Sequence, residues 1–350
     1  MSGKGAAGIL QEGFPSEDDP ATALDASSPS KHKLRLLFMG LKRSGKSSII
    51  NVILYKLPPT ETVFIPATVV IKKHCLQSFR NFQIWDLPGQ IDFLGSSFDT
   101  ESIFGTAGAM VWILDSQDDY VESIARLTET ILQLEQMYPG MKYSVFIHKV
   151  DSLSNDFRDD IVRDIIQRIL DDLNDAGLEN PPVLFYATSV YDDSIYEALS
   201  KVLQDLNPQL PTFEALLNTI TKSCNMQKVY LFDVVSKLYI ASDTSPKDMQ
   251  GYTLCSDYID TIVDLSEIYG WDRGKLTNGE SMMAVIGDQN AESFINGVRG
   301  YCLYLKEMNK FLAFIAFSKE PRFAEEKPLI DYNVQLFEDA LSEVLNLDIS

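Results

Sequence analysis

The feature that most constrains how this chain can fold is the loop sequence GLKRSGKS at residues 40–47. It matches the pattern GxxxxGK[ST] and directly follows an apolar run, Leu34 to Met39, that has the length of a β-strand. Glycines at these positions let the backbone wrap phosphate groups at the start of the following helix. A chance glycine-rich turn is the alternative, but the strand, loop and helix setting favours a phosphate-binding loop (P-loop) in an α/β fold.

Each position of this loop has an expected contact with a bound nucleotide. The Lys46 ammonium is expected at the β- and γ-phosphates, and the Ser47 hydroxyl is expected to bind Mg²⁺. The remaining positions are expected to meet the phosphates, chiefly through backbone N–H groups: Gly40, Lys42, Arg43, Ser44, Gly45 and Ser48.

Apolar runs of strand length alternate with amphipathic stretches over the first half of the chain. The runs are Leu34 to Met39, Phe82 to Trp85, Ala109 to Leu114, Ser144 to Ile147 and Val183 to Tyr186. Amphipathic stretches of helical length cover 120–137 and 157–176. This alternation predicts a mostly parallel sheet with helices on both faces.

The chain is too long for one ordinary core, and two prolines, Pro208 and Pro211, mark the expected boundary because proline interrupts a helix. We expect a disordered acidic tail at 1–32, a P-loop domain at 33–208 and a second domain at 209–350. In the second domain, strands are expected within 228–242 and near 282–286, 298–305 and 311–317. Helices are expected from about 212, at 246–269 and at 329–345, which together predict an α+β domain with an antiparallel sheet.

Charge and cysteine content narrow the possible partners. A net charge of −20 argues against binding to nucleic acid or to an anionic lipid surface. No apolar run reaches the ~18 residues of a membrane helix, and neither end carries a lipidation motif, so any membrane location is expected to come through partners. The cysteines, spaced far apart, are expected to be buried, reduced thiols of a cytoplasmic protein: Cys75, Cys224, Cys255 and Cys302.

A DxxG motif follows the strand at 82–85. Asp86 is expected to hold Mg²⁺ through water, and the Gly89 N–H is expected to meet the γ-phosphate. Gln90 comes next and can orient an attacking water. Thr68 is the preferred candidate for the threonine that joins Mg²⁺ to the γ-phosphate, with Thr60 and Thr62 as competitors.

The base is expected to be guanine because His148-Lys149-Val150-Asp151 is a variant of the NKxD motif. The Asp151 carboxylate can accept from guanine N1–H and N2–H₂, and the Lys149 stem can lie along the base. After the next strand, Thr188 and Ser189 stand where a base-binding loop would contribute N–H groups, although a plain strand-end turn fits almost as well. GTP or GDP with Mg²⁺ is therefore the expected cofactor.

These motifs resemble those of the Rag GTPases, and more closely those of the RagC/RagD class. The resemblance rests on residues 85–90, on 148–151 and on TSVYD at 188–192 running into DSIYEA at 193–198. Pro88 favours the RagC/RagD side, because the RagA/RagB side has glycine there. The similarity covers nearly everything from Leu34 onward, and it implies a fungal-type orthologue.

The resemblance also implies a fold, an activity and partners. It implies a roadblock-type or longin-like second domain that pairs with a RagA/RagB-like GTPase as an obligate heterodimer. It implies slow GTP hydrolysis accelerated by a GTPase-activating protein. Finally, it implies a scaffold complex on the lysosome or vacuole, where the heterodimer signals amino-acid sufficiency to the target-of-rapamycin kinase complex.

Two departures from Ras-type patterns bear on the chemistry. Lys42 and Arg43 stand where Ras-like proteins have small glycines, which leaves an inserted arginine finger little room. His148 replaces the asparagine of NKxD, so its ring tautomer must suit its neighbours. Two other functions stay open at this point: a nucleotide-holding scaffold with incidental hydrolysis, and an ATPase or kinase, which conflicts with the guanine motif.

Overall fold

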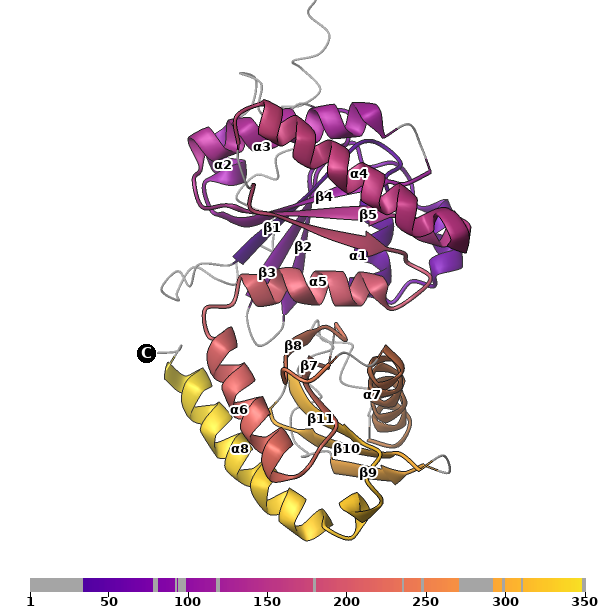
Figure 1. Ribbon diagram of the computed structural model, residues 1–350, viewed down its shortest axis with the longest axis vertical. Coiled ribbons are helices and arrows are strands. Elements are labelled where there is room, and N and C mark those ends of the chain that lie inside the picture. Colours follow the sequence, from indigo (N-terminus) through magenta and orange to yellow (C-terminus); the bar gives the residue numbers. More distant parts are fainter. Residues whose placement is uncertain are drawn as a thin grey trace, which may run out of the picture.

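The computed structural model describes residues 34–77, 81–91, 93, 99–117, 120–178, 181–234, 236–246, 249–270, 292–297, 300–309 and 311–347. These residues form two sheets, one in each half of the chain (Figure 1). The tail expected at 1–32 and the strand expected near 282–286 lie outside the described residues.

The first sheet has the strand order β2-β3-β1-β4-β5-β6. Its strands are β1 (Leu34–Met39), β2 (Lys72–Gln77), β3 (Asn81–Asp86), β4 (Ala107–Asp115), β5 (Lys142–His148) and β6 (Val183–Thr188). Only β2 runs antiparallel to its neighbour, so the carboxyl ends of the other strands meet at one edge of the sheet. The expected parallel sheet is confirmed; β2 was not predicted, because its sequence KKHCLQ has no apolar run.

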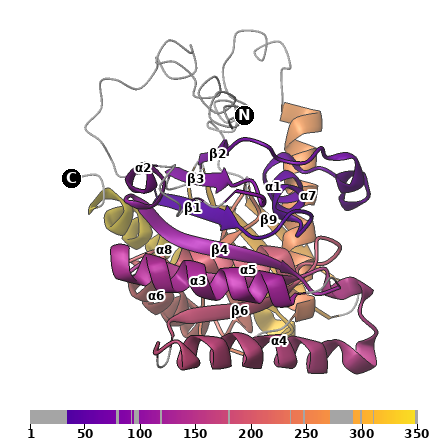
Figure 2. The same ribbon diagram turned by 90° about the horizontal axis from the view of Figure 1, so that it is seen from above.

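Helices cover both faces of this sheet, as expected. On one face lie α3 (Val121–Met137) and α4 (Asn155–Asp175), which run alongside each other (Figure 2). On the other face lie α1 (Lys46–Tyr55) and α5 (Ser194–Asp205). Three short helices complete this half: α2 (Thr100–Phe104), η1 (Pro59–Phe64) and η2 (Val150–Ser152).

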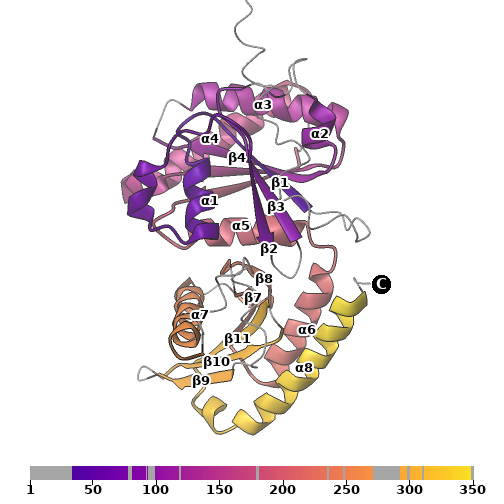
Figure 3. The same ribbon diagram turned by 180° about the vertical axis from the view of Figure 1, so that it is seen from behind.

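The second sheet is antiparallel throughout, with the order β8-β7-β11-β10-β9. Its strands are β7 (Lys228–Asp233), β8 (Tyr239–Ser242), β9 (Glu292–Asn296), β10 (Cys302–Glu307) and β11 (Leu312–Ser318). Its helices are α6 (Leu210–Ser223), α7 (Met249–Gly270), η5 (Pro321–Ala324) and α8 (Lys327–Leu347). The helices α6 and α8 cover one face and α7 the other (Figure 3), which confirms the α+β architecture and is consistent with a roadblock-like domain. None of the helices in the described ranges is long and apolar enough to cross a membrane.

Several details differ from the sequence predictions. Pro211 lies in the first turn of α6 and not before it, because proline is accepted where a helix has no N–H bond to lose. β10 begins at Cys302, after a turn in which Gly300 has a left-handed φ of 73°. Cys75 is exposed, contrary to the expected burial of all four cysteines, because it lies on the edge strand β2.

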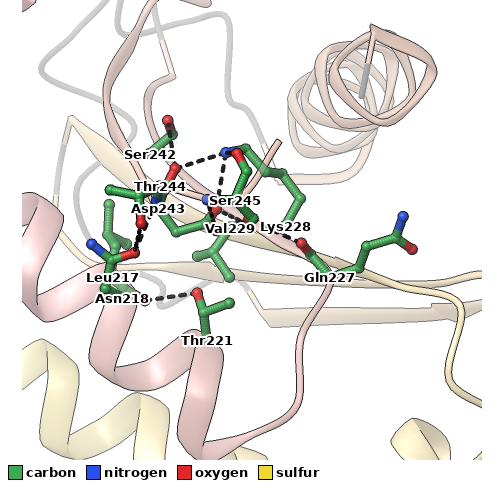
Figure 4. A network of polar contacts seen from close by, with 10 residues as sticks. All are labelled: Leu217, Asn218, Thr221, Gln227, Lys228, Val229, Ser242, Asp243, Thr244 and Ser245. Atoms are coloured by element: carbon green, nitrogen blue, oxygen red, sulfur yellow. Dashed lines mark hydrogen bonds and ion pairs between the residues drawn. The ribbon is translucent and has the colours of Figure 1, made fainter. Parts of the chain in front are cut away.

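A buried ion pair ties the start of β7 to the loop that follows β8 (Figure 4). The Lys228 Nζ donates to the carbonyls of Asp243 (2.7 Å) and Ser245 (2.9 Å) and lies 3.2 Å from the Asp243 Oδ1. Asp243 also accepts from the Val229 N–H through Oδ1 and from the Ser245 N–H through Oδ2, both at 2.9 Å. Both charges of the pair are therefore satisfied within the second domain.

The two halves touch along α5 and β8. The Gln204 Nε2 donates to the Tyr239 carbonyl (3.0 Å), and the Tyr239 N–H donates to the Ser200 hydroxyl (3.1 Å). Leu238, fully buried, packs with apolar side chains of the first domain. Thus α5 covers one edge of the second sheet, while β9 forms the other edge.

Candidate functional site

The loop between β1 and α1 has the backbone geometry of a phosphate cradle. Gly40 has a φ of 134°, and a Cβ there would lie 2.2 Å from the Ile113 carbonyl oxygen, so only glycine fits. Arg43 and Gly45 have left-handed φ angles of 65° and 105°. Gly45 caps α1 without a side-chain hydrogen bond, which leaves the first N–H groups of the helix, including that of Ser48, for an anion.

Lys46 is held inside this loop. It is 5% exposed, and its Nζ donates to the carbonyls of Gly40 and Leu41, each at 2.8 Å. Burial lowers the pKa of this ammonium to about 8, and the nearby Asp86 carboxylate opposes the shift. A buried cation whose partners are two carbonyls and, at 3.4 Å, the Ser44 hydroxyl is suited to an anionic ligand such as a polyphosphate.

The residues expected to bind the metal lie together. The Ser47 Oγ donates to the Asp86 Oδ2 (2.5 Å), the Thr68 Oγ1 donates to the same oxygen (3.0 Å), and the two hydroxyls are 2.8 Å apart. Thr62 instead bonds the Pro59 carbonyl within its own turn, and Thr60 is exposed. The Asp86 Oδ1 is buried with no hydrogen-bond partner among the described residues. This set of oxygens fits Mg²⁺, which binds carboxylate and hydroxyl oxygens together with nucleotide phosphates and water.

The DxxG segment lies against the P-loop. A Cβ on Gly89 would come within 2.5 Å of the Leu41 carbonyl carbon and the Lys42 N, so only glycine can approach this closely. Gln90 is exposed and lines a cavity of about 320 Å³ together with Gly40 and Gly89. The structure therefore brings Gln90 to the phosphate end of the site.

The guanine motif joins the same site from the other side. The His148 ring lies against Gly45, and a Cβ on that glycine would be 2.6 Å from the ring Cδ2. The His148 Nδ1 is 3.0 Å from the Thr188 hydroxyl, across the paired ends of β5 and β6. Burial, followed by the charge of Lys149, lowers the pKa of His148 to about 4, so the ring is neutral at pH 7.

The charged residues of this motif have defined partners. The exposed Asp151 accepts a hydrogen bond from the Ser189 hydroxyl (2.6 Å). The Lys149 Nζ donates to the Arg43 carbonyl (2.8 Å) and to the Asp115 carboxylate (2.5 Å). The guanine motif and the P-loop are thereby joined, while the Lys42 and Arg43 side chains point to solvent as exposed groups.

Asp115 is a site residue that the sequence reasoning missed. It is the last residue of β4 and is aligned with His148 at the end of β5. A signal was present, because a carboxylate at the end of a parallel strand lies at the edge where ligands bind. Its role as the partner of Lys149 depends on a contact between residues 34 positions apart.

Comparison with known proteins agrees with this geometry. Residues 35–259 match the family model described as the Gtr1/RagA G protein conserved region. The chain is 49% identical over 323 residues to Ras-related GTP-binding protein C of Mus musculus, covering 91% of this chain and 78% of that protein. It is 45% identical over 312 residues to GTP-binding protein gtr2 of Schizosaccharomyces pombe, covering 89% and 98%.

A third relative shows how far the similarity extends. The chain is 34% identical over 324 residues to GTP-binding protein GTR2 of Saccharomyces cerevisiae, covering 89% of this chain and 93% of that protein. Identity is thus higher to this mammalian protein than to either yeast protein, and the assignment to a fungal-type orthologue stays a prediction. The chain belongs to the Gtr1/RagA family of G proteins, on the side that includes RagC, RagD and Gtr2, and is a GTPase of that family.

Proposed function

We propose that this protein is a guanine-nucleotide switch that binds GTP and GDP with Mg²⁺ and hydrolyses GTP slowly. The observation that carries the proposal is that the hydroxyls of Ser47 and Thr68 both donate to one oxygen of the buried Asp86 carboxylate. These residues come from α1, from the segment after η1 and from β3, so a metal held between them links the P-loop to two segments that can move.

Each of the other site residues has a role in this proposal. Lys46 neutralises the β- and γ-phosphates, and the Gly89 N–H senses whether the γ-phosphate is present. Gln90 orients the attacking water and is the proposed catalytic residue. Asp151, held by Ser189, reads the guanine N1–H and N2–H₂.

Hydrolysis is tested by single-turnover release of γ-phosphate from bound GTP, with and without a GTPase-activating protein. Gln90→Leu is expected to slow stimulated release by about 100-fold, since the attacking water loses its orienting group. If the wild type and Gln90→Leu release phosphate equally slowly even with the activating protein, the alternative function is favoured. That alternative is a scaffold that holds nucleotide without turning it over.

Guanine recognition has its own test. Asp151→Asn is expected to move the preference from guanine towards xanthine nucleotides, because an amide can donate to the xanthine 2-oxo group. Competition among GTP, XTP and ATP measures this, and unchanged selectivity for GTP would rule out the assignment of Asp151.

The second domain is proposed to pair with a RagA/RagB-like GTPase as an obligate heterodimer. Support comes from the edge strand β9, which in the described residues pairs with β10 alone and has Ile295 40% exposed. An open strand edge with apolar side chains is a template for strand addition by another chain. The family membership supports the remaining partners: a lysosomal or vacuolar scaffold complex, a GTPase-activating protein and the target-of-rapamycin kinase complex.

The heterodimer is tested by co-expressing the full chain with a RagA/RagB-like protein and measuring the complex by sedimentation. Ile295→Asp is expected to weaken the complex. Leu184→Asp is the matched control, because Leu184 is 42% exposed on β6, an edge strand of the first sheet. Equal effects of the two variants would exclude the β9 edge as the pairing surface.

A further inference from the structure

Helix α5 contacts both the guanine loop of the first domain and strand β8 of the second domain. Its first residues directly follow the guanine loop, and the hydroxyl of Ser194, the first residue of the helix, accepts a hydrogen bond from the Ser189 N–H of that loop. Further along, Ser200 and Gln204 bond the backbone of Tyr239 in the second domain. The guanine site and the contact between the two sheets therefore share one rigid element.

The guanine loop is held by a ring of short-range hydrogen bonds. The Ser189 Oγ donates to the Asp151 Oδ1 and accepts from the Tyr191 N–H (3.0 Å). The Ser189 N–H donates to the Ser194 Oγ (2.9 Å), and the Ser194 N–H donates to the Asp192 Oδ1 (2.9 Å). The position of the guanine-reading carboxylate thus depends on how residues 189–194 are placed.

One contact between the second domain and this loop is a hydrogen bond from α7. The Thr253 Oγ1, on α7, donates to the Asp193 Oδ2 at 2.6 Å. Asp193 lies between Asp192 and Ser194, which both belong to the ring. Beside this contact the loop lines a cavity of about 240 Å³ together with Lys237 of the second domain, so the packing leaves room for the loop to shift if it is released.

We propose that Thr253 is a positioning residue of the guanine site: through Asp193 it holds the loop that carries Ser189, and so the second domain completes the nucleotide site of the first. This inference rests on the proposed guanine-nucleotide function. Coupling between two equilibria is reciprocal. Bound nucleotide therefore stabilises the contact of α7 with the guanine loop by the same free energy that the contact adds to nucleotide binding. Whatever displaces the second domain then speeds nucleotide release.

The test compares Thr253→Val with Thr261→Val in the full chain loaded with fluorescent GDP. Both changes replace an exposed threonine of α7 by a residue of the same shape, but among the described residues the Thr261 hydroxyl bonds the Asp257 carbonyl of its own helix and no other group. Thr253→Val is expected to release GDP about threefold to tenfold faster than Thr261→Val, the factor that corresponds to the loss of one exposed hydrogen bond of ordinary strength. The acceleration should be the same with Mg²⁺ and with EDTA, because the metal residues lie elsewhere.

A measurement of base specificity distinguishes a role of Thr253 in positioning Asp151 from a general weakening of nucleotide binding. Inosine diphosphate lacks the 2-amino group that meets Asp151, so Thr253→Val is expected to reduce the preference for GDP over IDP as well. Equal release rates and equal GDP/IDP ratios in the two variants would overturn the inference while leaving the guanine site intact. A wild-type chain that binds no GDP would instead overturn the proposed function together with this inference.

Discussion

In the part of the chain that the structure describes, each half buries one lysine ammonium, and the two lysines differ in what neutralises them. Lys46 is 5% exposed and donates to carbonyls and to the Ser44 hydroxyl of its own loop. Lys228 is 2% exposed and donates to carbonyls too, but it also has the Asp243 carboxylate 3.2 Å away. Lys228 thus has a carboxylate in direct contact, whereas Lys46 has the Asp86 carboxylate near it but no ion pair among the described residues, which suits an anionic ligand.

The carboxylates of Asp243 and Asp86 also differ in whether both oxygens have hydrogen-bond partners. Both oxygens of Asp243 accept hydrogen bonds from backbone N–H groups. In Asp86 the Oδ2 accepts from two hydroxyls, whereas the Oδ1 has no partner among the described residues. A buried polar group left without a partner costs stability, and in Asp86 it belongs to the carboxylate that Ser47 and Thr68 contact, which fits a metal ligand.

The largest expected effect comes from breaking the satisfied pair. Asp243→Ala is expected to lower the free energy of unfolding by about 3–5 kcal/mol, because it leaves the Lys228 ammonium buried without a carboxylate. Chemical denaturation measures the loss. Lys228→Met combined with Asp243→Asn should recover a large part of it, since no charge is then buried and the asparagine can still accept from Val229. A full-sized loss in that double variant would contradict the account.

Removal of Lys46, which has no carboxylate in direct contact among the described residues, should affect binding and not folding. Lys46→Met is expected to weaken GTP binding by about 100-fold, since charge-assisted bonds to two phosphates are lost. Without nucleotide its unfolding free energy should equal or exceed that of the wild type, because no buried cation remains. Equilibrium binding measures the loss of GTP affinity, and chemical denaturation measures the free energy of unfolding. A nucleotide-free variant less stable than the wild type would contradict the contrast between Lys46 and Lys228.

Acid should destabilise the guanine motif through His148. Its folded-state pKa of about 4 lies below the ordinary value of 6.5, so the unfolded chain binds the proton first. The stability from this group is complete above pH 6.5 and is lost as pH falls towards 4, by on the order of 2 kcal/mol at pH 4.5. His148→Asn removes this contribution, and parallel pH profiles of wild type and variant would rule it out.

The smallest expected effect is the pH dependence of nucleotide affinity. The Lys46 pKa of about 8 means that the ammonium needed for phosphate binding is present below pH 8 and is lost above it. Affinity for GTP should be level below pH 8 and fall by at most about tenfold per pH unit above it. Titrations at pH 7, 8 and 9 test the slope; an affinity that stays level to pH 9 would show that Lys46 remains protonated.

The sequence alone determined the order of the phosphate, metal and guanine motifs and the class of both sheets. Such motifs can be read from local spacing because each one lies in a short loop after a parallel strand. Parallel strands then bring these loops to one edge without further information. The apolar runs of β1, β4 and β5 likewise predicted the buried strands, whereas β2, at the edge with charged residues, left no such pattern.

Tertiary structure decided every relation between groups that are distant in sequence. Thr68 joins Asp86 while Thr62 bonds its own turn, a distinction that spacing left open. The pairs Lys149 with Asp115 and Thr253 with Asp193 form because packing places separate elements side by side. A motif states which chemical groups are present, but only the packed chain states which of them are already neutralised and which wait for a ligand.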